Sequence, residues 1–227
     1  NWVIGIGLVG TWSLQSPSLW ARSSMKSMKP DPDKDVVLAC QAGGARGLEG
    51  PFRSIYDRYR DRVYNVCYRI TGNATDALDA SQETFGILFR KIDGFRFQSR
   101  FSSWVYRIAV NASIDLKRRA SSRRLASLEA VQDDGEGGRI EFCDDSIELP
   151  GVAASRHELE QEVQRAITRL SPKLRVITVL RYVEHLSYDQ IAETLQISLG
   201  TVKSRIARAH DALDRELTPV LDRHYLG

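Results

Sequence analysis

Thr201, Ser204 and Arg208 recur at intervals of three or four residues near the end of the chain, with Lys203 and Arg205 between them. This spacing places the first three side chains on one face of a helix and the two basic residues on its flanks. Guanidinium, ammonium and hydroxyl groups bind base edges in the DNA major groove and backbone phosphates. The pattern therefore indicates a helix that recognises DNA.

The surrounding residues predict how this helix is held. Its apolar face is formed by Leu199, Val202, Ile206, Ala209 and Leu213. A shorter helix capped by Ser187 precedes it. A short helix, a tight turn and a longer helix with a basic outer face are typical of a helix-turn-helix. Gln196 occupies the turn, where such motifs often have glycine. An ordinary amphipathic surface helix is the alternative interpretation.

Helical periodicity also runs through residues 35–124. Pro51 suits the first turn of a helix, and an interruption at 71–73 separates it from the next one. A second helical block covers 158–226, in which Ser171 and Pro172 begin a helix. The residues predicted to face inward are Phe52, Ile55, Tyr59, Val63, Val66, Ile70, Leu78, Phe85, Leu88, Ile92, Phe101, Trp104, Val105, Ile108, Leu174, Ile177, Leu180 and Tyr182.

The charge distribution predicts how the two blocks are connected. The net charge is only +3, which is weak evidence for a nucleic-acid partner. Residues 100–124 hold seven basic residues and one acid, whereas 129–148 hold eight acids and one base. We therefore predict an all-α fold of two small helical domains joined by a flexible acidic linker, with the helix-turn-helix in the second domain. The predicted domains are 29–124 and 157–227, and the predicted linker is 125–156.

The first residues differ from the rest of the chain. Residues 1–21 carry no charge and include a short apolar run without a preceding basic residue. We expect 1–28 to be disordered or to lie outside the native protein, with a membrane anchor as the alternative. Cys40, Cys67 and Cys143 lack metal-ligand spacing. With no nucleophile–base set, phosphate loop or metal cluster apparent, we predict a cytoplasmic protein that is not an enzyme and needs no metal, cofactor or small-molecule substrate.

Two longer segments resemble one known family. YRITGNATDALDASQETF (68–85) and WVYRIAVNASIDLKRR (104–119) resemble the polymerase-docking and promoter-melting regions of bacterial sigma factors of the extracytoplasmic-function class. The segment from Leu170 to Leu213, which contains the predicted helix-turn-helix, resembles the fourth conserved region of the same family. The resemblance covers about 35–217, apart from the linker.

The resemblance implies a role for each matching residue. Core RNA polymerase would be bound by Asp79, Gln82 and Glu83. The minus-ten promoter element, including a flipped base, would be bound by Phe95, Phe97, Trp104, Arg107, Asn111, Lys117, Arg118 and Arg119. The minus-thirty-five element would be bound by Thr201, Lys203, Ser204, Arg205 and Arg208. For individual residues, a solvated polar face or an aromatic core remains the simpler alternative. The linker would enter polymerase channels or serve as a tether.

The expected function is thus that of an alternative sigma factor, which directs core RNA polymerase to specific promoters. Promoter DNA, core RNA polymerase and an anti-sigma protein are the expected partners, and no membrane is expected. A stand-alone helix-turn-helix regulator that binds an operator as a dimer is the main competing hypothesis, although it leaves residues 76–85 unexplained. An adaptor that has kept polymerase binding but lost promoter activity is a third.

Overall fold

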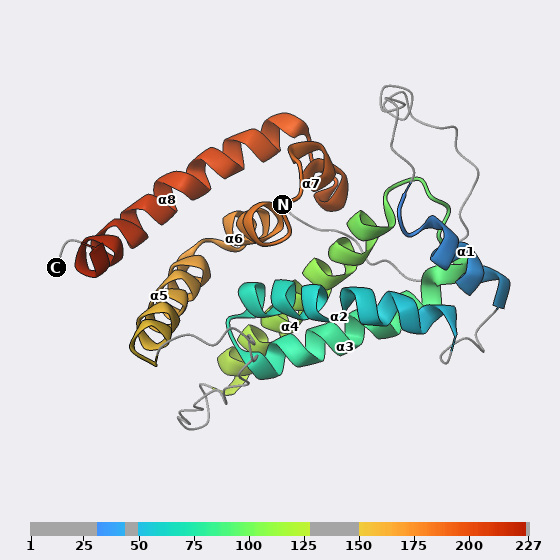
Figure 1. The fold of residues 1–227 in the computed structure, drawn as a ribbon, viewed down its shortest axis with the longest axis horizontal. Coiled ribbons are helices and arrows are strands. Elements are labelled where there is room, and N and C mark those ends of the chain that lie inside the picture. The colour runs from blue at the N-terminus through green and yellow to red at the C-terminus, as the bar shows by residue number, and fades with distance from the viewer. Residues whose placement is uncertain (1–30, 44–49, 128–149, 226–227) are drawn as a thin grey trace. The chain divides into compact units, whose positions relative to one another are not determined.

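Every regular element that the structure describes is helical. The structure, a computed structural model, describes residues 31–43, 50–127 and 150–225. In chain order the elements are α1 (Lys34–Gly43), α2 (Pro51–Thr71), α3 (Ala74–Lys91), the 3₁₀ turn η3 (Ile92–Gly94), α4 (Phe101–Ser127), α5 (Pro150–Arg169), α6 (Pro172–Thr178), the π-helical turn η4 (Val179–Val183), α7 (Tyr188–Leu195) and α8 (Leu199–Tyr225) (Figure 1). The all-α prediction is confirmed for these ranges.

Helices α2, α3 and α4 pack against one another around an apolar core (Figure 1). The predicted stripe of α2 is confirmed, because all six of its residues from Phe52 to Ile70 are buried. Gly72 ends α2 in the left-handed conformation at φ 82°, and its backbone N–H donates to Tyr68 O at 2.8 Å. The Asn73 side chain then accepts from the Asp76 N–H and begins α3.

The predicted inward face of α3 is wrong at one position. Leu78 is 42% exposed, whereas Phe85, Leu88 and Ile92 are buried as expected. The inner face instead begins with small side chains, among them Ala77 and Ala80, which are fully buried. Small residues let helices approach closely, and Leu78, one residue past Ala77, turns toward solvent.

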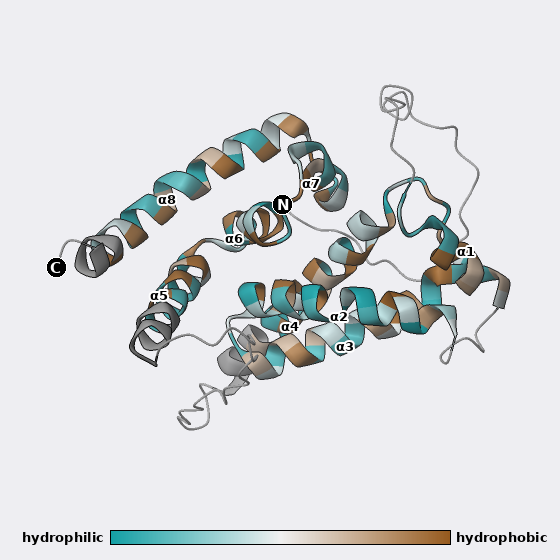
Figure 2. Ribbon diagram, viewed as in Figure 1, coloured by the Kyte–Doolittle hydropathy of each residue, from teal (hydrophilic) through white to brown (hydrophobic). Residues whose placement is uncertain are grey.

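The second half of the chain is built from α5 to α8. Ser171 and Pro172 begin α6 as predicted, but the Ser171 side chain accepts no capping hydrogen bond. The Ser171 carbonyl accepts from the Leu174 and Arg175 N–H groups. The cap predicted at Ser187 is confirmed at the start of α7, where Gln190 completes a capping box. Polar and apolar turns alternate along α8, in keeping with its one buried face (Figure 2).

Tyr182 was predicted to face inward and is 46% exposed, so this prediction is wrong. It lies in η4, where the helix is wound as a π-turn. A π-turn takes more residues per turn than an α-helix, and the inward phase of Ile177 and Leu180 therefore no longer extends to Tyr182. Simple 3.6-residue periodicity does not anticipate such a turn.

Hydrogen bonds connect α5–η4 to α2. The buried Arg175 guanidinium donates to the carbonyl of Ile70 at the end of α2, at 2.9 Å, and to carbonyls at the end of α5, including Leu170 at 3.1 Å. Arg62 of α2 pairs with the buried Glu184 carboxylate at 2.9 Å. From Pro32 onward the chain clusters as a single compact unit, and the domain boundaries predicted at the linker remain a prediction.

Helices extend into both ends of the predicted linker. Helix α4 continues to Ser127 and α5 begins at Pro150, whereas the linker was predicted to span 125–156. Most of the acidic segment, residues 128–149, lies outside the described residues, as does the predicted N-terminal segment 1–28. Within the described ranges, no helix has both the length and the apolar character needed to cross a lipid bilayer.

Candidate nucleic-acid and polymerase interface

The turn between α7 and α8 has the geometry of a helix-turn-helix. Ser187 accepts from the Gln190 N–H, and the Gln190 side chain accepts from the Ser187 N–H in return. Gln196 ends α7 in the left-handed conformation, at φ 53° and ψ 46°, where helices usually have glycine. Gln196 therefore adopts the conformation that the predicted turn requires, at a cost in backbone strain.

The face of α8 opposite its buried residues carries the predicted DNA-binding set. Val202, Ile206 and Ala209 are buried, so the helix is fixed in rotation about its axis. The prediction is wrong for Leu199, which is 38% exposed because it lies in the first turn of α8, at the edge of the packed face. The other face is solvent-accessible, with exposed side chains at Lys203, Ser204 and Arg208 and half-buried ones at Thr201 and Arg205.

Local hydrogen bonds orient part of this face. The Ser198 hydroxyl accepts from the Thr201 N–H at 3.1 Å and also contacts the Thr201 hydroxyl at 2.8 Å. Arg208 Nε donates to the Ser204 carbonyl at 3.3 Å, one helical turn earlier. Because only Nε is used in this bond, the two terminal nitrogens of Arg208 can still form a bidentate contact with a base edge.

An aromatic cluster forms the segment between η3 and α4. The Phe95 ring stacks on Trp104 with centroids 5.0 Å apart and meets Phe101 edge-on at 5.4 Å. Phe95 is 9% exposed, so its ring supports Trp104 from the core side instead of presenting a free face to a base. Phe97 is half-buried, contacts Phe95 edge-on, and has a φ of 53°, which is strained for a bulky residue.

The polar residues predicted for minus-ten recognition lie along α4. Asn111, Arg118 and Arg119 are exposed, whereas Arg107 and Lys117 are half-buried. Burial lowers the pKa of Lys117, and the neighbouring Arg175 charge lowers it further. Burial also lowers the pKa of Arg107, an effect that the Glu193 carboxylate opposes.

Helix α4 also contacts the helix-turn-helix. Ser103 Oγ donates to Glu193 Oε2 of α7 at 3.0 Å, and the same carboxylate opposes the lowering of the Arg107 pKa by burial. The structure therefore brings the helix predicted to melt the promoter together with the helix that supports α8. Sequence patterns gave no sign of this contact, since the two residues of the hydrogen bond are 90 positions apart.

The predicted polymerase-binding residues share one exposed strip of α3. Asp79, Gln82 and Glu83 are all exposed at helical spacing. Leu78, which is exposed beside Asp79, adds an apolar side chain to this strip. A polar face with an exposed leucine is better suited to a protein partner than a purely solvated face, because apolar contacts supply most association energy.

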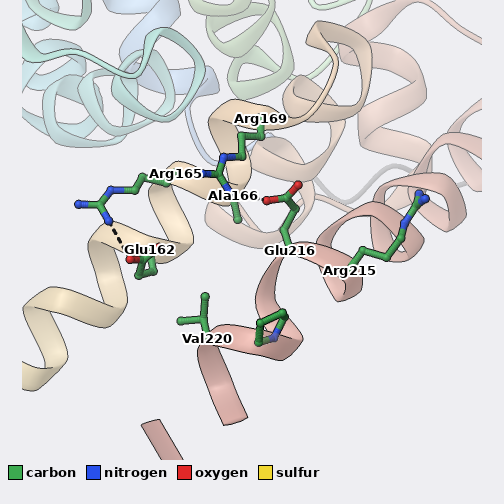
Figure 3. A pocket seen from close by; sticks show the side chains of 8 residues that line it. Glu162, Arg165, Ala166, Arg169, Arg215, Glu216 and Val220 are labelled. Atoms are coloured by element: carbon green, nitrogen blue, oxygen red, sulfur yellow. Dashed lines mark hydrogen bonds and ion pairs between the residues drawn. The ribbon is translucent and has the colours of Figure 1, made fainter. Parts of the chain in front are cut away.

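A polar pocket of about 390 Å³ lies between α5 and α8, and no residue of the predicted sites lines it (Figure 3). Its charged side chains are largely paired across or along its walls. Arg169 meets Glu216 at 2.7 Å, and Arg165 meets Glu162 at 2.7 Å. Charged side chains form most of the lining, whereas a typical small-molecule site is lined mainly by apolar ones.

Comparison with known families matches both halves of the chain. Residues 55–123 match the model of sigma-70 region 2, and residues 160–213 match that of sigma-70 region 4. The chain is 37% identical over 172 residues to the ECF RNA polymerase sigma factor SigW of Bacillus subtilis, covering 76% of this chain and 91% of that protein.

This chain belongs to the ECF sigma factors. A second relative, the RNA polymerase sigma-H factor of Pseudomonas aeruginosa, is 34% identical over 191 residues and covers 84% of this sigma factor and 96% of its own length. The predicted helix-turn-helix lies within the region 4 match, and the α3 strip and α4 lie within the region 2 match.

Two solved structures share the fold of this sigma factor. The sigma factor RpoE of Bartonella quintana, in complex with the anti-sigma factor NepR, aligns with a TM-score of 0.58 at 20% identity over 74% of this chain and 96% of that one. CnrH, in complex with the cytosolic domain of CnrY, aligns with a TM-score of 0.58 at 23% identity over 82% and 97%.

Proposed function

We propose that this ECF sigma factor docks on core RNA polymerase through the exposed strip of α3 and reads the two promoter elements with α8 and α4. The presence of both family regions on one chain carries the proposal, since a DNA-reading helix alone would suit any regulator. The α3 strip supplies Asp79, Gln82 and Glu83 as polar contacts, with Leu78 as an apolar one.

Recognition of the minus-thirty-five element belongs to α8. Its buried face fixes the helix, so that Ser204 and Arg208 project from the opposite side. Arg208 is suited to a bidentate contact with guanine, and Lys203 and Arg205 to neighbouring phosphates. Thr201 is bonded to Ser198, which suits it to a backbone or methyl contact more than to specific base readout.

Recognition of the minus-ten element belongs to α4 and the segment before it. Trp104 is backed by Phe95, so its ring is held rigidly enough for a flipped base to stack on it. Asn111 offers an amide for base hydrogen bonds. The exposed Arg118 and Arg119, with Lys117, form a basic end that attracts phosphates. Phe97, at the opening of the aromatic cluster, would line the side of the base site.

The same proposal covers regulation and location. The two structural relatives were solved with an anti-sigma factor and with the cytosolic domain of CnrY, and we propose an anti-sigma protein as a regulatory partner of this chain too. The sigma factor itself would bind polymerase and DNA in the cytoplasm without catalysing a reaction. No cofactor or small-molecule substrate enters the proposal.

Run-off transcription tests the function. Purified chain and core RNA polymerase are incubated with a library of bacterial promoter fragments, and we expect transcripts that start downstream of a shared pair of elements. Operator binding by a dimer without polymerase would support the stand-alone regulator instead. Polymerase binding without any promoter-specific transcript would support the adaptor.

A single substitution tests the role of α8. Arg208→Ala should weaken binding to the minus-thirty-five element by about 1–3 kcal/mol and relax the preference at one base pair. Arg215→Ala is the matched control, because Arg215 is exposed on the same helix and also donates Nε to the carbonyl four residues earlier. Binding of polymerase holoenzyme to promoters with single base-pair changes measures both effects. If the affinity fell equally for every promoter, Arg208 would contact a phosphate and would not read a base.

A further inference from the structure

Gln41 of α1 connects the first helix to the aromatic segment before α4. Its side-chain Nε2 donates to the carbonyl of Ile92 at 2.9 Å and to that of Phe95 at 2.8 Å. Both bonds are partly buried and cross more than fifty positions of sequence. Helix α1 contains none of the residues predicted to touch DNA or polymerase.

The two carbonyls occupy the start of the segment that would hold the flipped base. Ile92 O also accepts from the Phe95 N–H at 3.0 Å, which closes the 3₁₀ turn η3. Phe95 then places its ring beneath Trp104, and Phe97, two residues on, adopts its strained backbone conformation. One amide group thus binds the backbone at the first residue of η3 and at the residue that follows this turn.

The direction of these bonds explains why an amide is needed. A primary amide nitrogen has two N–H donors and can satisfy both carbonyls at once. A carboxylate of the same shape has no donor and would face two carbonyl oxygens with a negative charge. A leucine of similar size would fill the space but leave two partly buried carbonyls without this donor.

We propose that Gln41 is a positioning residue for base capture, which holds the Phe95–Phe97 segment and hence Trp104 in the geometry that receives the unpaired base of the minus-ten element. The proposal rests on the proposed function, because it concerns the same promoter site. It adds a residue outside the DNA-contacting helices to the determinants of minus-ten specificity. Removing two neutral hydrogen bonds should reduce base discrimination by about 3- to 10-fold.

The experiment measures discrimination by holoenzyme assembled from core polymerase and the full chain. Each position of the minus-ten element is changed in turn to the other three bases, and open-complex formation is followed for each promoter. Gln41→Leu and Gln41→Glu are compared with the unmodified chain. Ala39→Leu is the control, because it introduces the same leucine at an exposed position of α1.

The ratio between the best and the other bases separates positioning from folding. A variant that only lowers the amount of folded chain reduces transcription from every promoter alike and leaves the ratio unchanged. We expect both Gln41 variants to flatten the ratio at one position, with Gln41→Glu at least as severe, while binding to the minus-thirty-five element stays constant. An unchanged ratio in both variants would overturn the proposal.

A second measurement does not depend on transcription. Amide hydrogen exchange in the isolated chain should be faster over residues 95–100 in Gln41→Leu than in Ala39→Leu, with α2 unaffected. Unchanged exchange there would also overturn the proposal. If the unmodified chain directs no promoter-specific transcript, the proposed function itself fails. If it directs transcripts with a base preference that the variants retain, only the role of Gln41 fails.

Discussion

At the scale of single residues, buried side chains in the α2–α4 core have chemical properties set by their surroundings. Cys67 is fully buried, and burial raises the pKa of its thiol from the ordinary value of 9.0 to about 11. A hydrogen bond with Ser113 offsets part of this shift. Cys40, also buried, has a pKa raised by burial and by the nearby Asp93 charge.

These shifts predict slow thiol chemistry in the native chain. Near pH 8, a change in pKa from 9.0 to about 11 reduces the thiolate fraction of Cys67 about 100-fold. The reaction of Cys67 with a disulfide reagent, followed in a Cys143→Ser chain, should therefore be at least about 100-fold slower in buffer than in urea. Because the folded pKa is the higher one, the thiol's stabilising contribution is present below pH 9 and is lost as the pH rises toward 11. A rapid burst equal to one or two thiols in buffer would contradict the burial.

At the scale of elements, the turn between α7 and α8 is determined mainly by residues close together in the sequence. The Ser187 cap and the position of the turn could be predicted because they depend on such neighbouring residues, whereas the return bond from Gln190 was not predicted. The conformation of Gln196 follows as well, since the two helices can meet only through a left-handed residue. Its strain is the cost of having a side chain there.

Gln196→Gly should therefore stabilise the chain. Glycine adopts the left-handed conformation without a Cβ penalty, and we expect the free energy of unfolding to rise by about 1 kcal/mol. Urea denaturation followed by circular dichroism measures the change. Gln196→Ala is the control and should give no such gain, because alanine retains Cβ. A glycine variant no more stable than the alanine one would show that another contact of Gln196 offsets the strain.

Sequence patterns predicted the elements better than their exact faces. The stripe of α2 and the breaks around Gly72 are correct because apolar periodicity and turn residues act locally. Leu78 was placed on the wrong face because alanines, which carry little hydropathy, form the close contact of α3. Tyr182 was misplaced by the π-turn. The contacts of Gln41 and Glu193 join residues 51 to 90 positions apart, and no local pattern encodes such pairs.

At the scale of the whole molecule, an ion pair between Arg62 of α2 and the buried Glu184, which follows η4, joins the two elements. The Glu184 side chain is 3% exposed, and Arg62, which is 49% exposed, binds it through two nitrogens and lies over the Tyr106 ring at 5.5 Å. The pKa of Tyr106 is raised by burial and then by the Glu184 charge. Arg62 thus supplies a positive charge for the buried Glu184 carboxylate, and the Tyr106 hydroxyl lies near this carboxylate as well.

Arg62→Met should lower the free energy of unfolding by about 1–3 kcal/mol, because it leaves a buried carboxylate without its guanidinium. The value is below that of a fully buried pair since Arg62 is half-exposed. Arg60→Met is the matched control: Arg60 lies on the same helix and pairs with Asp61 on the surface, 3.5 Å away. Urea denaturation of both variants, and of Arg62→Met combined with Glu184→Gln, measures the effect. If Arg60→Met and Arg62→Met lowered the free energy of unfolding equally, the buried Glu184 carboxylate would not make the Arg62 pair more important than a surface pair.

Ile70 and Arg175, which a hydrogen bond joins, precede and follow residues 128–149 in the sequence. The Arg175 guanidinium donates to backbone carbonyls at the end of α2 and just after α5, and nearby the Arg62–Glu184 ion pair links α2 to the end of η4. None of these contacts requires an intact backbone between residues 128 and 149. A chain cleaved there by an engineered protease site should therefore migrate as one particle under native conditions, its two fragments held together as noncovalent partners.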